Sequence, residues 1–474
     1  MRYDTVIVGG GAAGGILAAR ATEDPECSVL LLEAGPDFGP DPEGQPPDVI
    51  NADDPGPTDY DWGLEAELGT LGRRSPVFAG RLLGGSSATN NVMALRGRPA
   101  DYDAWASAGN HGWSYEEVLA DFVGVERDLD FGEAAWHGDA GPVPVCRPGE
   151  PAPVQQAFLD ACATAGHPAV ADHNAPGAVG AGPLPLNQIG GVRQSTALTC
   201  LATARERSNL TIRGDATVDR VLIDRGRCLG VRLAGSGEEI EAGQVVLTAG
   251  AYGSPVILLR SGIGPADHLR PLGIPVTADL PGVGANLHDH PLLRLLYASH
   301  APAAAPPRQT LLTTGPGLQI FPSGPEQGEV LLLVALMAPH SRGHVRLRSP
   351  DPYTPPDIDV GLLRAPEDAP RLLDGVHQAR RLARTPPLSR YLDDELWPGP
   401  TADPDDALHE GLNVYQHPVG TCRMGPPNDP HAVVTPSGHV HGLEGLRVAD
   451  ASIMPTIPRA NTHLPTLMLA EHLA

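Results

Sequence analysis

Short apolar runs separated by glycine-rich turns open the chain. Residues 5–8 form a β-branched run that ends at Gly9, and small apolar residues from Ile16 to Ala19 begin a helix after the turn. A second apolar run follows at residues 28–32. This order predicts a strand, a tight turn, a helix and a second strand.

The same pattern returns later in the chain. Short strands are expected between residues 209 and 233, and residues 244–250 form an apolar run that ends in glycine. A helix is expected at residues 254–261. We therefore expect residues 5–35 and 244–261 to contribute to one parallel sheet.

The remaining segments have different patterns. Residues 36–79 are polar and rich in proline, which predicts mostly loop. Residues 126–189 read as a peripheral segment with one helix at 154–165. Beyond residue 291 the pattern predicts a second sheet, with strands at 329–336 and 343–348 and a covering helix at 372–384.

Composition limits the function classes. The chain has 474 residues and a formal net charge of −24, so nucleic acid is not an expected partner. No apolar stretch is long enough for a transmembrane helix, and a strand begins too near Met1 for a signal peptide. The six cysteines show no paired spacing, which is typical of reduced thiols. We expect a soluble, cytoplasmic protein without a metal site.

The first turn has the pattern of a dinucleotide-binding loop. Gly9 permits the tight turn, Gly11 lets the backbone approach a pyrophosphate, and Gly14 lets the helix pack closely on the strand. Glu33 ends the second strand, where its carboxylate can accept both ribose hydroxyls of an adenosine. The loop alone does not separate NAD from FAD, but Glu33 followed by Ala34 and glycine is typical of FAD enzymes.

Four ordered segments resemble the signatures of the glucose-methanol-choline (GMC) oxidoreductase family. They are residues 80–97, 250–264, 283–291 and 445–455. The resemblance covers nearly the whole chain. It implies an α/β fold, with a Rossmann-like FAD-binding domain and a second α+β substrate domain built on an antiparallel sheet. We expect residues 1–125, 190–290 and 410–474 to form the first domain, and 126–189 with 291–409 to form the second.

The resemblance also implies the residues that contact FAD. The phosphate and isoalloxazine contacts are expected from Leu82, Gly85, Ser86, Asn90 and Met93; the adenine contact from Val218; the ribityl-phosphate contacts from Asp450 and Ala451; and the pyrimidine-edge contacts from Pro465 and Thr466. Members that attach FAD covalently place a histidine just before the motif asparagine. Because Thr89 stands there, we expect FAD to be bound non-covalently.

Two histidines are candidates for the chemistry. Oxidation of an alcohol requires a base at the hydroxyl oxygen, and histidine titrates in the right range. His417 matches the principal catalytic histidine of the family, and His463 matches a second position that holds histidine or asparagine. We expect the pair to hold one substrate oxygen, with either residue carrying the proton. We expect four other histidines to be structural: His288, His290, His439 and His441.

The predicted function is therefore FAD-dependent oxidation of a small-molecule alcohol. The electron acceptor is left open between O2, a quinone and another carrier, because no motif specifies the pocket near flavin C4a. The short chain also resembles a subgroup associated with mycofactocin, which predicts a dehydrogenase acting on reduced mycofactocin. The alternatives are an alcohol oxidase, a hydroxynitrile lyase-like enzyme that keeps FAD as structure, and a non-catalytic flavin-binding protein.

Overall fold

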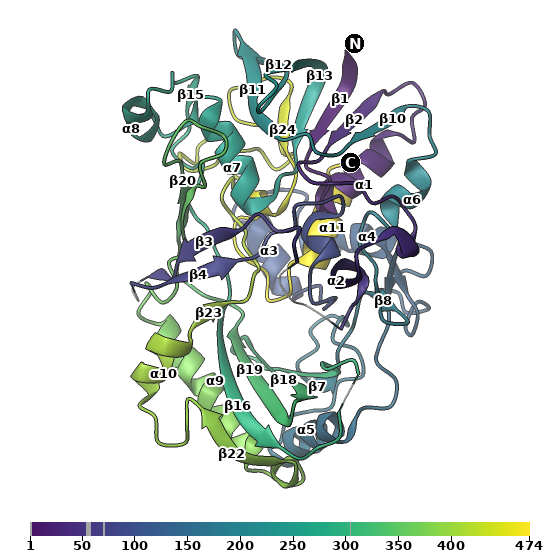
Figure 1. Cartoon of the computed structure of the whole chain (residues 1–474), viewed down its shortest axis with the longest axis vertical. Helices are drawn as coiled ribbons and strands as arrows, with labels where there is room; N and C mark the ends of the chain where they lie inside the picture. The colour runs from purple at the N-terminus through teal and green to yellow at the C-terminus, as the bar shows by residue number, and fades with distance from the viewer. Residues whose placement is uncertain (1, 54–57, 70–71, 304) are drawn as a thin grey trace.

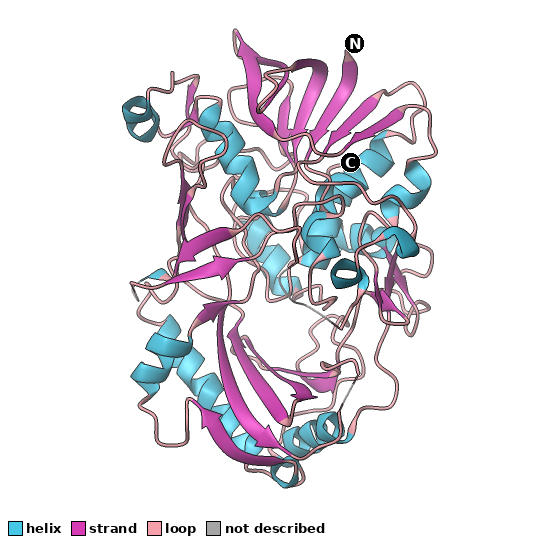
Figure 2. Ribbon diagram, in the orientation of Figure 1, coloured by secondary structure: helices cyan, strands magenta, loops and turns pink. Residues whose placement is uncertain are grey.

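A computed structural model describes residues 2–53, 58–69, 72–303 and 305–474. Two large sheets lie at opposite ends of its long axis, and most helices lie between them or on their faces (Figures 1 and 2). In the described part of the chain, no helix has the length and apolar character needed to cross a bilayer.

The first sheet is largely parallel. Its order is β10 (Leu210–Arg213), β2 (Val29–Leu32), β1 (Tyr3–Val8), β13 (Glu239–Leu247), β12 (Arg227–Leu233) and β11 (Val218–Asp224), and β24 (Leu446–Val448) also pairs with β13. The strand β1 pairs in parallel with both β2 and β13. The expected parallel sheet is thus confirmed. Its central strands are buried on both faces, which explains their continuous apolar runs.

Helices cover this sheet on the side that faces the middle of the molecule (Figure 1). They are α1 (Ala12–Ala21), α6 (Cys200–Ala204), α7 (Gly250–Arg260) and α11 (His463–His472). The C-terminal helix α11 packs beside α1, so the end of the chain returns to the first glycine turn.

The second sheet is antiparallel, as predicted. Its order is β22 (Leu392–Trp397), β16 (Pro291–Ser299), β19 (Glu329–Leu336), β18 (Leu318–Glu326), β17 (Thr310–Thr313) and β7 (Gly180–Pro183), and β23 (Asn413–Val414) pairs with β16. Helices α9 (Asp368–Ala383) and α5 (Pro153–Thr164) pack on it. Leu372, Val376 and Ala379 form the buried stripe of α9.

A four-stranded sheet corrects one prediction. It contains β20 (His344–Arg346), β21 (Asp357–Asp359), β3 (Leu64–Glu67) and β4 (Arg74–Val77). The strand predicted at 343–348 therefore lies here and not in the second large sheet, because it pairs with β21 and through it with the distant β3, and a local pattern carries no information on such partners. The described part of residues 36–79 is mostly loop, as predicted, apart from the pair of β3 and β4 and two short helical turns.

The other short elements connect these sheets. They are α2 (Pro47–Ile50), α3 (Pro99–Ser107), α4 (Tyr115–Val125), α8 (Ala266–Leu269), α10 (Pro404–Gly411), the pair β5 (Glu126–Asp128) and β6 (Val143–Val145), the pair β8 (Gln188–Ile189) and β9 (Val192–Arg193), and the pair β14 (Ile263–Gly264) and β15 (Ala278–Asp279).

Candidate active site

The glycine turn between β1 and α1 has the geometry of a phosphate-binding loop. Gly9 has a φ of 108°, and a Cβ on Gly14 would lie 1.9 Å from the Gly9 carbonyl oxygen. Gly11 is the N-cap of α1, where no side chain caps the helix and no acidic residue stands in the first turn. The N-terminal N–H groups of α1 therefore face this turn without a competing carboxylate.

Glu33 lies at the end of β2, beside the turn. Its carboxylate accepts hydrogen bonds from the Gly10 N–H at 2.8 Å and the Gly35 N–H at 3.0 Å. Burial raises the pKa of Glu33 to about 7. Each carboxylate oxygen keeps a further lone pair, so both can still accept a ribose hydroxyl. Ala34 follows, half-buried, and Val218 begins β11 shortly after Ala216, whose N–H bonds to the Glu33 carbonyl.

The segment that starts at Gly80 packs on this turn. The Gly84 N–H donates to the Gly10 carbonyl at 2.8 Å, and a Cβ on Gly85 would lie 2.8 Å from Gly11 Cα. Ser86 is exposed, whereas Leu82 is fully buried in a small apolar cluster. These contacts bring two of the predicted cofactor segments together.

Further along the same segment the chain reaches a cluster of buried side chains around His417. Asn90 is half-buried, and its Oδ1 accepts the Val92 N–H at 2.9 Å. Met93 is buried, with its Sδ 3.5 Å from Asn461 Nδ2 and 3.5 Å from the Tyr415 hydroxyl. The structure thus brings Met93 to Asn461 and Tyr415, both of which contact His417.

The predicted C-terminal contacts lie close to α7 and α11. The Asp450 carboxylate accepts hydrogen bonds from the Ser254 hydroxyl at 2.5 Å and the Gly250 N–H at 2.9 Å. These two hydrogen bonds fix the Asp450 side chain. Ala451 follows it in a short 3₁₀ turn. Pro465 and Thr466 lie in the first turn of α11, whose N-cap Thr462 makes no side-chain cap.

His417 is the centre of this cluster. Its ring is buried, and its Nε2 lies 3.1 Å from Asn461 Nδ2. The Tyr415 ring packs against it with a centroid distance of 4.3 Å. Burial is the main reason that the pKa of His417 lies well below its usual value, so this imidazole is neutral at neutral pH.

The residue that meets His417 is Asn461, not the His463 of the predicted pair. Among the described residues, no hydrogen bond or ring contact joins His463 to His417, and His463 Nε2 is buried without a partner. Helix α11 begins at His463 and fixes the direction of that side chain, whereas Asn461 lies in the turn before the helix. A catalytic role for His463 stays a prediction.

A second buried histidine, His290, contacts His417. The sequence analysis treated it as structural. His290 Nδ1 is 2.9 Å from His417 Nδ1, and the two rings are nearly perpendicular. Asp289 Oδ1 accepts the backbone N–H groups of both His417 and His290. The signal available in sequence was the dense polar motif at residues 286–290, but its contact with His417 is visible only in three dimensions.

Backbone strain occurs next to two of these residues. Val92, which precedes Met93, has a φ of 51°, and Gln416, which precedes His417, has a φ of 67°. Non-glycine residues avoid this region, most of all β-branched ones. Such strain is characteristic of functional sites, where the surrounding structure holds side chains in required directions.

The residues around the first glycine turn fit FAD. The uncapped N-terminus of α1 suits a pyrophosphate, the Glu33 carboxylate suits a ribose, and the close backbones of Gly11 and Gly85 exclude side chains between them. The segment from Gly80 to Met93 connects this glycine turn with Asn461 and His417.

Comparisons with known proteins show the family to which the chain belongs. Two family models described as GMC oxidoreductase match residues 3–292 and 339–470. A 5-(hydroxymethyl)furfural oxidase from Methylovorus sp. is 37% identical over 522 aligned positions, which cover 100% of this chain and 98% of that protein. An oxygen-dependent choline dehydrogenase from Chromohalobacter salexigens is 36% identical and is covered to 94%, again with 100% of this chain.

Solved structures are similar as well. The crystal structure of a pyridoxine 4-oxidase from Mesorbium loti has a TM-score of 0.93 and 33% sequence identity, covering 100% of this chain and 98% of that one. A fungal aryl-alcohol oxidase has a TM-score of 0.85 and 26% identity, with 100% of this chain and 98% of that one covered. The chain therefore belongs to the GMC oxidoreductase family and is an FAD-dependent enzyme that oxidises alcohols.

Proposed function

We propose that this enzyme oxidises a primary alcohol, with His417 Nε2 as the base that takes the hydroxyl proton. The observation that carries the proposal is the 3.1 Å contact between His417 Nε2 and Asn461 Nδ2, which directs a basic nitrogen and an amide donor at one point. FAD supplies the acceptor for the hydride that leaves the alcohol carbon.

His417 and Asn461 have complementary roles at the substrate oxygen. The neutral imidazole of His417 has a lone pair on Nε2, which contacts the Asn461 amide here and would take the hydroxyl proton once the alcohol binds. The Asn461 amide donates a hydrogen bond to the oxygen as negative charge develops on it. Between them the oxygen is held in one position, which orients the C–H bond for transfer.

The surroundings of this point favour an alcohol on an apolar or aromatic body. Tyr415 stacks on Phe321, with ring centroids 6.0 Å apart, and its hydroxyl touches Met93. The positive charge of half-buried Arg308 acts on the Tyr415 hydroxyl. A cation placed here would be repelled, so we propose a hydroxymethyl group on an aromatic ring in preference to choline.

The domain division is part of the proposal. The first sheet would carry FAD and the second would bound the substrate, with the sequence-based limits given above. One short strand, β23, lies in the predicted FAD segment and yet pairs with β16 of the second sheet. The relatives named above are not named for mycofactocin, so reduced mycofactocin as the donor stays a prediction, as do the electron acceptor and the lyase alternative.

Anaerobic mixing of the yellow protein with candidate alcohols tests the function. We expect hydroxymethylfuran and hydroxymethylpyridine compounds to bleach the flavin absorbance, and choline to do so far more slowly. Readmission of air then shows whether O2 reoxidises it. Absence of bleaching by every alcohol, with FAD still bound, would contradict alcohol oxidation and favour the lyase alternative.

Thr89 predicts how FAD is held. Threonine offers no imidazole nitrogen for a bond to the flavin, so we expect acid precipitation to release all of the yellow colour into the supernatant. Absorbance of the two fractions near 450 nm measures this. Colour that remains in the pellet would show a covalent bond and contradict the prediction.

A further inference from the structure

The two Nδ1 atoms of His290 and His417 share one hydrogen bond, 2.9 Å long. One of the two rings must donate and the other must accept, because a neutral imidazole carries a single N–H. Both rings are buried, and burial lowers the pKa of each, to about 3 for His290. Neither ring is therefore charged at neutral pH before substrate binds.

The neighbours of the pair fix the direction of this bond. Asn461 Nδ2 contacts both His417 Nε2 and the Met93 sulfur. The sulfur can only accept, so the amide atom on this side is the donor Nδ2, and His417 Nε2 must accept from it. His417 Nε2 thus carries the lone pair, and its proton is on Nδ1. That proton is donated to His290 Nδ1, and the remaining proton of His290 is on Nε2, a buried atom with no hydrogen-bond partner among the described residues.

The hydrogen bond between the two rings gives the proposed base a partner with which to share positive charge. A buried imidazole that accepts a proton becomes a buried cation, which is costly without a partner. We propose that His290 is a positioning residue, which keeps the basic lone pair of His417 on Nε2 and shares the proton taken from the alcohol. This inference rests on the proposed role of His417 as the base.

The proton balance is simple. The alcohol O–H bond breaks and a proton binds His417 Nε2, so His417 carries protons on both nitrogens. Its Nδ1 proton then moves along the existing hydrogen bond to His290 Nδ1. His417 becomes neutral again, and His290 becomes the cation, with protons on Nδ1 and Nε2. No oxidant or further reactant is needed for this transfer.

Asp289 supports the pair through the backbone. Its Oδ1 accepts the N–H groups of His417 and His290, and its buried Oδ2 has no partner among the described residues. Burial raises the pKa of Asp289 to about 7. The carboxyl group therefore ties together the two chain segments that carry the histidines, which are distant in sequence.

Two substitutions separate the roles of His290. His290→Leu removes the acceptor, while His290→Asn places an amide oxygen near the former Nδ1 position, where it accepts the His417 N–H but takes no proton. We expect anaerobic flavin reduction to fall about 100-fold in His290→Leu, within the range for general-base contributions, and about tenfold in His290→Asn. The substrate concentration for half-maximal reduction should change little in either variant.

Nitrogen-15 histidine NMR provides a readout that packing alone would not move. The signals of His417, assigned by their loss in His417→Ala, should show the Nδ1–H tautomer in the wild type and in His290→Asn. They should show loss of that preference in His290→Leu. Equal rates and equal tautomers in the two His290 variants would overturn the inference.

Two further variants distinguish a failure of the His290 proposal from a failure of the proposed function. His441 Nε2 lies 3.2 Å from the Gly425 carbonyl, away from His417, so His441→Gln should reduce flavin at the wild-type rate. If His417→Ala reduces flavin normally, the proposed function itself fails. If His417→Ala is inactive and His290→Leu behaves as the wild type, only the role of His290 fails.

Discussion

Replacement of His417 by alanine should leave a yellow, folded protein that is reduced by its alcohol about 10²–10⁴ times more slowly. The reason is that the variant has no group to accept the hydroxyl proton where Asn461 directs the oxygen. The measurement is the rate of flavin bleaching under anaerobic stopped flow at saturating alcohol, together with the FAD content of the purified variant.

The control for this result is another histidine that does not contact the cluster. His441→Ala should keep the wild-type reduction rate. His463→Ala, measured beside it, tests whether the second predicted histidine takes part. A His417→Ala protein that bleaches at the wild-type rate would remove the base from the mechanism.

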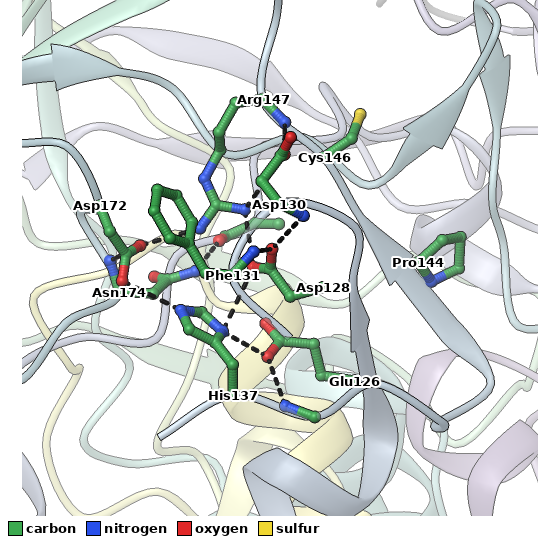
Figure 3. Close-up of polar contacts among 12 residues, drawn as sticks. Glu126, Asp128, Asp130, Phe131, His137, Pro144, Cys146, Arg147, Asp172 and Asn174 are labelled. Carbon is green, nitrogen blue, oxygen red and sulfur yellow. Dashed lines mark hydrogen bonds and ion pairs between the residues drawn. The ribbon is translucent and has the colours of Figure 1, made fainter. Parts of the chain in front are cut away.

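The second large effect is expected in a buried charge network beside the site (Figure 3). Arg96 and Glu126 pair directly, and both side chains are 1% exposed. His137 lies between Glu126 at 2.7 Å and Asp172 at 3.0 Å. Burial by itself lowers the pKa of His137, but its hydrogen bonds to Asp172 and Glu126 raise it overall, which favours the protonated ring.

The network has the donor types of a cation site, since Glu126, Asp128 and His137 converge. However, two arginines already pair with its carboxylates, because Arg147 bonds to Asp128 at 2.7 Å. We therefore interpret the network as internal charge pairing.

Glu126→Ala should lower the free energy of unfolding by about 3–5 kcal/mol, because it leaves the Arg96 charge buried and unpaired. The loss of the Glu126 carboxylate should also affect the active site. Asn174 bonds to the backbone of Ala94 and of Arg96, directly after Met93, so the variant should also lose FAD more readily. Thermal or denaturant melting followed by flavin release measures both effects.

An exposed ion pair supplies the comparison. Arg213 and Glu238 bond at 2.8 Å, but both side chains are more than 40% exposed. Glu238→Ala should melt nearly as the wild type does, because water screens that pair. Equal melting of Glu126→Ala and Glu238→Ala would contradict the importance of the buried network.

The parts of the site that are formed by residues close together in the sequence could be predicted from it. The turn from Gly9 to Gly14 and the carboxylate of Glu33 follow from a strand, a turn and a helix in direct succession, and the structure has each of them in place. The parallel pairing of β1 with β13 followed from two buried apolar runs that each end in glycine.

Contacts between distant segments could not be predicted in this way. Asn461 and His463 are two residues apart, and only the start of α11 decides which of them faces His417. The contact of His290 with His417 depends on the meeting of two loops around Asp289. The strand at residues 344–346 was recognised, but its partner was not, because pairing with β21 and β3 is a property of the whole fold.

The four-stranded sheet has a consequence for how substrate enters. Its strands come from residues 64–77 on one side and 344–359 on the other, and they meet where Asp359 pairs with Glu67 and the Val360 N–H donates to the Glu67 carbonyl at 2.9 Å. A hinge motion that separated the two large sheets would have to break these backbone bonds. We therefore expect the two large sheets to keep their relative position during the reaction, and alcohol and product to enter and leave through movements of surface loops.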